Sequence, residues 1–524
     1  MSGGPGTSRS AVDLGGGPGL MHPPSDYIDG EFRAIDSSPS SATIISCDPS
    51  EPNRVIWAGS SRRDHVDDAV AAARRALRSW SRASLDDRVA VLRRWQALTL
   101  THAERIAGCI TDEMGKTLAE ARLEAKALAD KVDITLDRIS FSRVTDYTVP
   151  VAATRRGTCT FRPHGVMAVI GPFNFPAHLP NGHFVPALLL GNTVVFKPSE
   201  KTPGVGQILA ELMHDAGMPA GVFNLVQGSA DIARALVGHE DVDGILFTGS
   251  WPVGRRILEA NLDRPGRIVA LEMGGSNPAV VMPSADLRQA VIECVRAGFA
   301  TTGQRCTCTR RVLVHERIAP RFITLLQKTA STLLIGPGRS TEPIFMGPAV
   351  SAAAADAVLS FQRRQIEAGG RLLLESTRLD RPGHFVTPGI VQVERFSLDR
   401  DEELFGPFLQ VAVIPSLEEA IVQANATRFG LAASIFTRDD AEWTEFMASC
   451  RAGCVNRNTG TAGVSSKLPF GGLGQSGNHR PAAAFSVDYC AYPVSSMIEE
   501  SADAAVPTGM LWSDGWVVGS ADAS

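Results

Sequence analysis

The sequence predicts an α/β protein with a mostly parallel sheet. Two observations carry this prediction: short apolar runs recur after Pro163, and helical or glycine-rich segments separate them. Strands and helices in alternation are typical of a parallel sheet that is covered on both faces. With 524 residues, the chain is also long enough for two or three domains with a large core. The predicted strands are 166–170, 193–197, 223–227, 244–247, 268–271 and 279–282.

The chain before this sheet is predicted to be largely helical. From Asp64 to Trp80, apolar residues recur at helical spacing, and Asp64 and Asp67 stand where a cap and a first-turn acid are favoured. Two further helices are expected at about 86–111 and 118–139. The short β-like segments within 147–161 do not alternate with helices. They are either an arm that packs on another subunit or a surface hairpin.

A second set of strands and helices is expected from 278 to about 452, and a helix at 287–300 leads directly into the segment that carries Cys306. Residues 1–24 are rich in Gly, Pro and Ser and contain no apolar stretch, so we expect a disordered tail and no secretory signal. Residues 497–524 are acidic and rich in small residues, and the sequence does not place them.

Composition argues against several classes of partner. Hydrophobic residues make up 44% and charged residues 20%, the balance of an ordinary soluble protein, and the net charge of -5 argues against nucleic acid. The most apolar stretch, 185–196, is too short to span a bilayer, so no membrane partner is expected. The 9 cysteines contain no Cys-x-x-Cys pair, so we expect no metal site and a reducing cytoplasm.

Three residues suggest covalent chemistry on a carbonyl. Cys306 stands in Gly303-Gln304-Arg305-Cys306-Thr307-Cys308, and a cysteine thiolate is a strong nucleophile. Glu272, in Leu271-Glu272-Met273-Gly274-Gly275, can reach a site as a general base. Asn174 follows the predicted strand 166–170 and offers an amide that can stabilise an oxyanion. Taken alone, Cys306 also reads as an ordinary core cysteine and Asn174 as a turn former.

Other residues suggest a nucleotide site at the carboxyl ends of the strands, where such sheets bind ligands. The segment Gly249-Ser250-Trp251-Pro252-Val253-Gly254 opens a helix whose backbone amides suit a pyrophosphate, although a plain helix cap is the alternative. This segment is not a Walker A loop, and it does not have the Gly-x-Gly-x-x-Gly spacing. Lys197 and Glu200 are either partners of an adenosine or a surface ion pair.

At these residues the chain resembles the aldehyde dehydrogenase superfamily from about Tyr27 to Ser496. The resemblance implies a Rossmann-type NAD-binding domain, an α/β catalytic domain and a small β oligomerisation arm. It rests on seven ordered motifs: Gly171-Pro172-Phe173-Asn174-Phe175-Pro176, Val195-Phe196-Lys197-Pro198-Ser199-Glu200, Phe247-Thr248-Gly249-Ser250, Leu271-Glu272-Met273-Gly274-Gly275, Gly303-Gln304-Arg305-Cys306, Glu403-Leu404-Phe405-Gly406-Pro407 and Pro469-Phe470-Gly471-Gly472.

The resemblance also implies roles for single residues. Cys306 would attack the aldehyde, while Asn174 and the Cys306 backbone N–H would hold the oxyanion. Hydride transfer to the cofactor would leave a thioester, and Glu272 would activate the water that hydrolyses it. The cofactor would be held by Lys197 and Glu200 at the adenine ribose, by residues of the 249–254 segment at the pyrophosphate, and by Glu403, with Phe405, at the nicotinamide ribose. Glu200 favours NAD, because a 2′-phosphate would face its negative charge.

Within the superfamily, the stretches 174–183, 303–311, 476–481 and 488–493 resemble the branch that oxidises a succinylated glutamate semialdehyde in arginine catabolism. A substrate with two carboxylates and an amide calls for cationic and polar groups. Arg457 and Lys467 depart from the expected pattern, so another acidic semialdehyde is an alternative, and a catalytically silent protein on this fold is a third. The candidates for substrate contact are His178, Asn181, His183, Arg305, Ser465 and Ser466.

The domain boundaries follow from the same resemblance. Residues 25–145 and 162–271 are expected to form the NAD-binding domain, and 272–480 the catalytic domain. Residues 146–161 and 481–498 are expected to form the arm of a homodimer or homotetramer. Residues 1–24 and 499–524 would be terminal extensions.

Overall fold

The computed structural model describes residues 19–38 and 43–518, whose strands form two seven-stranded sheets and three smaller ones. The first large sheet has the order β11-β10-β7-β8-β9-β1-β2. Its five strands from β11 to β9 are parallel, and β1 is antiparallel to both of its neighbours. The strands are β1 (Ser25–Ile28), β2 (Glu31–Ala34), β7 (Val166–Ile170), β8 (Thr193–Lys197), β9 (Phe223–Leu225), β10 (Gly244–Thr248) and β11 (Ile268–Glu272).

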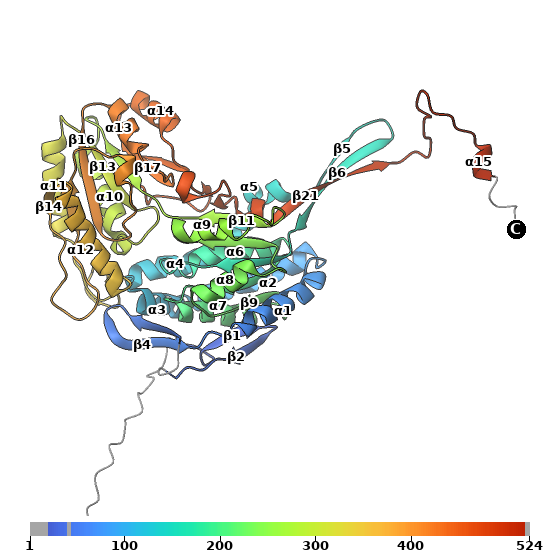
Figure 1. Cartoon of the computed structure of the whole chain (residues 1–524), viewed down its shortest axis with the longest axis horizontal. Helices are drawn as coiled ribbons and strands as arrows, with labels where there is room; N and C mark the ends of the chain where they lie inside the picture. The colour runs from blue at the N-terminus through green and yellow to red at the C-terminus, as the bar shows by residue number, and fades with distance from the viewer. Residues whose placement is uncertain (1–18, 39–42, 519–524) are drawn as a thin grey trace, which may run out of the picture.

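Helices cover both faces of this sheet, as the alternation of strands and helices predicts (Figure 1). In β7, Met167 and Val169 face the core formed with five helices, whereas Ala168 and Ile170 face the core formed with three others. The strand is buried on both sides, which explains its unbroken apolar run. The first group is α2 (Leu85–Thr101), α3 (Ala103–Met114), α4 (Leu118–Leu136), α6 (His178–Leu189) and α7 (Pro203–Asp215); the second is α1 (Asp64–Trp80), α8 (Ala230–Gly238) and α9 (Trp251–Glu259).

The prediction of one continuous helix at 86–111 is wrong, because this stretch forms two helices, α2 and α3. The chain leaves helical geometry at His102, with φ -101° and ψ 18°, and this residue ends α2 and begins α3. Neither proline nor glycine marks the break. The third predicted helix ends early, because Asp137 is extended and its side chain accepts a hydrogen bond from Ile139 N at 2.9 Å, which starts the short α5 (Arg138–Phe141).

The second large sheet has the order β14-β15-β16-β13-β12-β17-β18, and only β14 at its edge runs antiparallel. One face packs on α10 (Leu287–Phe299) and α11 (Ala319–Ser331), and the other on α13 (Leu417–Ala424) and α14 (Asp440–Ser449). A further helix, α12 (Ala352–Glu367), packs beside β15. The strands are β12 (Asn277–Val281), β13 (Thr309–His315), β14 (Arg371–Leu374), β15 (Gly389–Gln392), β16 (Phe408–Ile414), β17 (Ala432–Phe436) and β18 (Cys454–Arg457).

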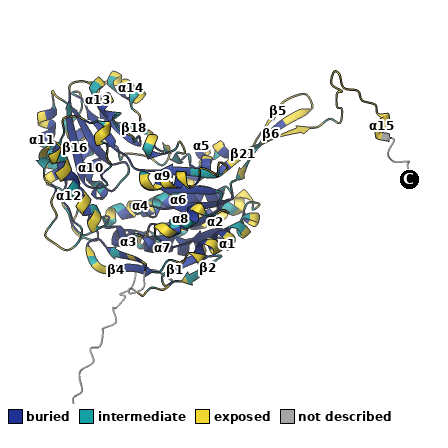
Figure 2. Ribbon diagram, in the orientation of Figure 1, coloured by how far each residue is buried: buried dark blue, intermediate teal, exposed yellow. Residues whose placement is uncertain are grey.

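A three-stranded antiparallel ribbon projects from the body (Figure 1). It joins β5 (Tyr147–Pro150), β6 (Arg155–Pro163) and β21 (Ala491–Glu499), in the order β21-β6-β5. Its outer half is largely exposed, as Figure 2 shows, and Tyr147, Val149 and Met497 present apolar side chains there. The ribbon therefore brings together the two segments that the sequence assigned to an arm.

The predicted terminal tails differ in outcome. Residues 1–18 of the predicted disordered tail lie outside the described residues. The rest of that prediction is wrong: the backbone N–H groups of Met21 and His22 both donate to Glu211 at 3.1 Å, and the His22 ring stacks on Phe32 at 3.9 Å. At the other end, residues 500–517 extend past the ribbon and are largely exposed. No helix in the described part of the chain has the length and apolarity to cross a bilayer.

Candidate active site

A cleft of about 1400 Å³ lies between the two large sheets, at the carboxyl ends of β7, β8, β10 and β11. The cleft brings together nearly all of the predicted catalytic and cofactor residues. Those that line it are Asn174, Lys197, Glu200, Gly249, Ser250, Trp251, Pro252, Val253, Glu272, Cys306, Glu403 and Phe405. Residues far apart in sequence thus meet in one site that is large enough for a dinucleotide and a small substrate.

Cys306 reaches the cleft through a tight left-handed turn. After α10, Thr301, Thr302 and Gly303 have φ values of 54°, 57° and 67°. A Cβ at Gly303 would overlap the backbone of Gly406, so this position requires glycine for both its conformation and its close packing. The turn delivers Cys306 to the second sheet, where the amide of Asn277 donates to the Cys306 carbonyl at 2.7 Å.

The Cys306 thiol is neutral in the form described. Burial raises its pKa to about 12, and the neighbouring carboxylates Glu403 and Glu272 raise it further. The adjacent Cys308 is fully buried and free. A nucleophilic Cys306 therefore needs additional positive charge or a nearby base when substrate is present.

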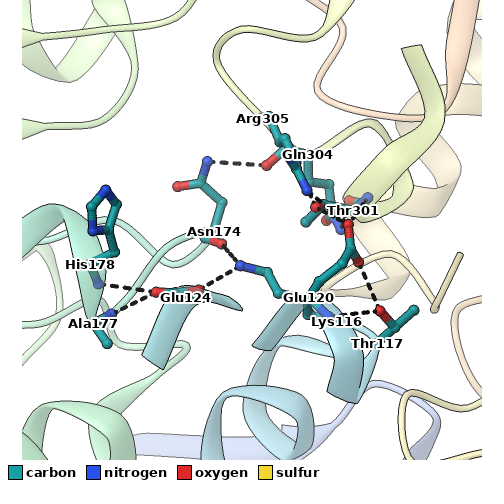
Figure 3. A network of polar contacts seen from close by, with 10 residues as sticks. All are labelled: Lys116, Thr117, Glu120, Glu124, Asn174, Ala177, His178, Thr301, Gln304 and Arg305. Atoms are coloured by element: carbon teal, nitrogen blue, oxygen red, sulfur yellow. Dashed lines mark hydrogen bonds and ion pairs between the residues drawn. The ribbon is translucent and has the colours of Figure 1, made fainter. Parts of the chain in front are cut away.

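Asn174 holds its side chain directly against the Cys306 segment (Figure 3). Its Nδ2 donates to the Gln304 carbonyl at 3.1 Å, and its own carbonyl accepts from Lys116 Nζ at 2.8 Å. The residue is 5% exposed. Because an amide has two N–H groups, the bond to Gln304 leaves one of them for a ligand.

Glu272 ends β11 and is 4% exposed. Burial raises its pKa well above the usual carboxyl range. Its Oε2 has no hydrogen-bond partner within residues 19–38 and 43–518. Thr248 of β10 lies beside it in the sheet register. A buried carboxyl with a free oxygen is suited to take a proton from a water or a thiol in the cleft.

The start of α9 forms one wall of the cleft. Ser250 is extended at the helix cap and makes no side-chain cap hydrogen bond. The amides of Val253 and Gly254 donate to the Ser250 carbonyl at 3.1 and 3.0 Å, so they belong to the helix turn. Gly254 does not line the cleft, and a Cβ there would overlap Met273, so packing explains this glycine. Its contact with the cofactor stays a prediction.

Lys197 and Glu200 lie at the end of β8. The Lys197 side chain is buried and donates from Nζ to the Pro198 carbonyl at 2.7 Å, and burial lowers its pKa to about 8. Its Nζ lies 3.9 Å from Glu200, whose side chain is 48% exposed. Lys197 and Glu200 thus form the ion pair that was the alternative to adenosine binding, and both residues also line the cleft.

Glu403 closes the cleft from the second sheet. Its Oε1 accepts from the Gly275 backbone N–H at 3.0 Å. A Cβ at Gly274 would overlap the Glu403 carboxylate, so the two glycines make room for this side chain. Burial raises the pKa of Glu403, and Arg310 opposes that shift. The Phe405 ring lies nearby, edge-on to Phe173 with centroids 5.8 Å apart.

Two predicted substrate residues are part of the core instead. Asn181 accepts from Trp95 Nε1 and donates to the Leu128 carbonyl, both at 3.1 Å. The ring of His183 bonds Tyr489 Oη at 2.9 Å and Thr248 Oγ1 at 3.1 Å, and burial lowers its pKa to about 3. Neither residue lines the cleft and their polar atoms bond the protein, so their contact with substrate stays a prediction.

The remaining substrate candidates also lie outside the cleft lining. Arg305 donates to Glu120 at 2.8 Å and to Thr301 Oγ1 at 2.7 Å. His178 has a buried Nδ1 without a hydrogen-bond partner among the described residues, and burial lowers its pKa. Ser465 and Ser466 lie on an exposed loop.

Of the two cations that favoured another acidic substrate, Arg457 pairs with Asp440 at 2.6 Å, and Lys467 is exposed.

Sequence reasoning missed three charged residues beside the site: Lys116, Glu120 and Glu124. Lys116 and Glu124 form an ion pair at 2.6 Å with no exposed side-chain surface. This ion pair joins the connection before α4 to the helix itself and carries no local sequence signal, because its partners in the Asn174 loop are distant in sequence.

Comparison with known proteins gives the family. The model of the aldehyde dehydrogenase family matches residues 36–493. The chain belongs to the aldehyde dehydrogenase family. The predicted family and α/β fold class are thereby confirmed.

Over 457 residues, the chain is 44% identical to the N-succinylglutamate 5-semialdehyde dehydrogenase of Paraburkholderia xenovorans (strain LB400). The matched stretch covers 87% of this chain and 93% of that protein.

Solved structures of this family have closely similar folds. The crystal structure of an NAD-dependent aldehyde dehydrogenase from Sinorhizobium meliloti matches with a TM-score of 0.86 and 30% identity, over 93% of this chain and 96% of that one. An E. coli NADP dependent enzyme matches with a TM-score of 0.85 and 31% identity, over 92% of this chain and 100% of that one.

Proposed function

We propose that this aldehyde dehydrogenase oxidises N-succinyl-L-glutamate 5-semialdehyde to N-succinyl-L-glutamate, with NAD as the hydride acceptor, in arginine catabolism. One observation carries the reaction class: Cys306, Asn174 and Glu272 line the same cleft as Lys197 and Glu200. The substrate is supported by the 44% identity to a relative of that name. The resemblance of the chain's distinctive stretches to the same branch supports it too.

The residues of the cleft fit NAD. The Ser250–Trp251 end of α9 faces the cleft and suits a pyrophosphate. Lys197 and Glu200 would hold the adenine ribose, and Glu403 the nicotinamide ribose. When bound, NAD supplies a positively charged ring that takes up a hydride. Glu200 favours NAD over NADP, because its carboxylate would repel a 2′-phosphate.

In the first half of the reaction, Cys306 attacks the aldehyde carbon. Its proton leaves to water, and the positive charge that bound NAD would supply offsets the burial and the carboxylates Glu403 and Glu272, which raise the thiol pKa. The new S–C bond turns the carbonyl oxygen into an oxyanion, which the free Asn174 N–H and the Cys306 backbone N–H stabilise. The tetrahedral carbon then loses its hydrogen with the bonding electron pair, the carbonyl re-forms, and the substrate is left as a thioester on Cys306.

In the second half, Glu272 takes a proton from water. The resulting hydroxide attacks the thioester carbon, the same donors hold the oxyanion, and the C–S bond breaks with its electron pair on sulfur. The carboxylic acid product leaves, and Cys306 is ready for another cycle. Gly471 packs directly beside the Glu272 carboxyl, where a Cβ would lie 3.0 Å from Oε1, and so leaves it room.

The test is an assay of NADH formation across aldehydes. The panel contains N-succinylglutamate semialdehyde, other acidic semialdehydes and simple aliphatic aldehydes. We expect kcat/KM to be highest for the succinylated compound, by roughly 100-fold over aliphatic aldehydes, since two missing charge contacts cost about 3 kcal/mol. Comparable values for the aliphatic aldehydes would contradict the proposed substrate, and a higher value for another acidic semialdehyde would establish the alternative.

The Cys306→Ala variant separates the enzyme from a silent protein on the same fold. We expect wild-type NADH formation to disappear in the variant while NAD still binds. Equal signals in both proteins would show that turnover does not use Cys306.

We also propose a domain organisation and an assembly. Residues 25–145 and 162–271 would form the NAD-binding domain and 272–480 the catalytic domain. Residues 146–161 and 481–498 would form the arm of a homodimer or homotetramer, which the exposed apolar side chains of Val149, Val151 and Met497 support. A cytoplasmic location is supported by the 9 free cysteines. Light scattering of the purified chain tests the assembly, and a monomer would contradict it.

A further inference from the structure

Two carboxylates of α4, Glu120 and Glu124, lie beside the loops that carry Asn174 and Gln304 (Figure 3). They are one helical turn apart, so both side chains project from the same face of the helix. Each one bonds a different active-site loop. The chemistry described above does not use either residue.

Glu124 fixes the loop that carries Asn174. Its Oε1 accepts from the backbone N–H groups of Ala177 and His178 at 3.0 and 3.1 Å. Its Oε2 accepts from Lys116 Nζ at 2.6 Å, and Lys116 in turn donates to the Asn174 carbonyl at 2.8 Å. The same ammonium lies 3.7 Å from the centre of the Phe175 ring. One buried ion pair therefore holds this loop at two places, the Asn174 carbonyl and the backbone N–H groups of Ala177 and His178.

Glu120 fixes the loop that leads to Cys306. Its Oε1 accepts from the Thr301 backbone N–H at 3.0 Å, from Thr301 Oγ1 at 2.8 Å and from Arg305 at 2.8 Å. Thr301 is in the left-handed region with φ 54°, which a β-branched residue adopts only when its surroundings enforce it. The other oxygen of Glu120 bonds Thr117 Oγ1 at 3.2 Å, so the N-terminal cap of α4 sets the direction of the carboxylate.

The two loops meet at the Asn174 Nδ2 to Gln304 carbonyl bond of 3.1 Å. We propose that Glu120 and Glu124 are positioning residues, which set the distance between the two oxyanion donors, the Asn174 amide and the Cys306 backbone N–H. The charges balance locally, with Lys116 opposite Glu124 and Arg305 opposite Glu120. This inference rests on the proposed aldehyde oxidation, because only that reaction gives the two donors a common target.

The first experiment measures the pre-steady-state burst of NADH by rapid mixing. Glu120→Ala should slow the burst by roughly 30-fold, since a displacement of about 1 Å in a reacting group costs on the order of 100-fold. The dissociation constant for NAD should stay within about two-fold, since Glu120 is not among the residues that line the coenzyme cleft. Glu104→Ala is the matched control: Glu104 of α3 accepts from Arg122 of α4 at 2.8 Å in an exposed pair, and the burst of this variant should equal that of wild type.

A second substitution distinguishes positioning from a loss of folding. Glycine tolerates φ of about 54° without strain, so Thr301→Gly in the Glu120→Ala background should recover about ten-fold of the lost burst rate. If Glu120→Ala does not fold, Glu120→Gln is measured instead. Its amide oxygen still accepts from Thr301 but does not neutralise Arg305, so an intermediate burst rate is expected. A wild-type burst rate in the folded Ala or Gln variant would overturn the role of Glu120.

Glu124→Gln tests the other loop by a reaction that forms no oxyanion. Alkylation of Cys306 by iodoacetamide, followed on its peptide by mass spectrometry, should stay within about two-fold of wild type, whereas the burst should slow by about ten-fold. An unchanged burst, or equal losses in both reactions, would overturn the role of Glu124. The outcomes are separable from those of the proposed function, because a wild-type enzyme that forms no NADH would contradict that function whatever the variants do.

Discussion

Replacing Asn174 by alanine is the most informative single change at the oxyanion site. The substitution removes the N–H that the reaction would use and the bond that the same amide makes to Gln304 at 3.1 Å. It leaves the coenzyme wall intact, because Lys197 and Glu200 lie at the end of β8 and Ser250 precedes α9. We therefore expect a loss confined to the chemical steps.

The size of the kinetic loss follows from the interactions that the substitution removes, one oxyanion donor and one hydrogen bond in the folded protein. Removal of one preorganised oxyanion donor costs about 100- to 1000-fold in kcat, which corresponds to about 3 to 4 kcal/mol. The folded protein loses one neutral hydrogen bond, worth about 1 kcal/mol, so the thermal midpoint should fall only slightly. A large kinetic effect with a small effect on stability is thus expected for Asn174→Ala.

Asn181→Ala is the matched control, with the opposite pattern. Asn181 is fully buried and bonds Trp95 and Leu128, and its removal leaves the Trp95 indole N–H without its acceptor. We expect a loss of about 2 to 3 kcal/mol in the free energy of unfolding, with kcat/KM within about two-fold of wild type. The assay pairs steady-state NADH formation with denaturant unfolding of both variants. A kcat for Asn174→Ala within three-fold of wild type, or an equal kinetic loss in Asn181→Ala, would refute the reasoning.

Three further changes test other parts of the site. Glu200→Gln removes the charge expected to repel a 2′-phosphate, so kcat/KM with NADP should rise by about five- to ten-fold relative to kcat/KM with NAD. If coupled assays show the same ratio of the two values in the variant and wild type, Glu200 does not select NAD. The raised pKa of Glu272 means that the unfolded chain releases a proton that the folded chain keeps, so folding stability falls as pH rises above about 5. Glu272→Gln should therefore show a gain in thermal midpoint over wild type that grows as pH rises above about 5. Gly303→Ala should lower the free energy of unfolding by at least about 2 kcal/mol, because a Cβ there meets Gly406 and φ is 67°. Gly182→Ala has nothing within 4 Å of its Cβ, so denaturant unfolding should show it to be neutral or stabilising.

Much of the fold is encoded locally. The strands at 166–170 and 193–197 were predicted residue for residue, because strands buried on both faces are unbroken apolar runs between turn residues. The site residues of the cleft were predicted for a different reason: they stand in motifs that resemble the family's, and glycines mark the motifs of Glu272 and Cys306. Gly274 and Gly303 stand where a side chain would overlap Glu403 or the Gly406 backbone, so the sequence signals close packing there.

What the sequence did not predict depends on distant partners. Asn181 and His183 looked like substrate groups because they follow Asn174, yet Asn181 is hydrogen-bonded to Trp95 and His183 to Tyr489. Glu120 looked like an ordinary helix residue, and its contact with Thr301 joins positions 181 residues apart. The start of the chain looked disordered, and only the buried carboxylate of Glu211 shows why Met21 and His22 are fixed. Polar contacts of this kind have no periodicity from which to predict them.

The covalent role of Cys306 is tested most directly in the Glu272→Gln variant. The variant is mixed with NAD and aldehyde, the NADH formed is measured against the concentration of active sites, and the protein is then digested and analysed by mass spectrometry. We expect one NADH per site, little further turnover, and the acyl group of the substrate on the Cys306 peptide. Continued turnover at the wild-type rate, or a burst of NADH with Cys306 left unmodified, would contradict the account.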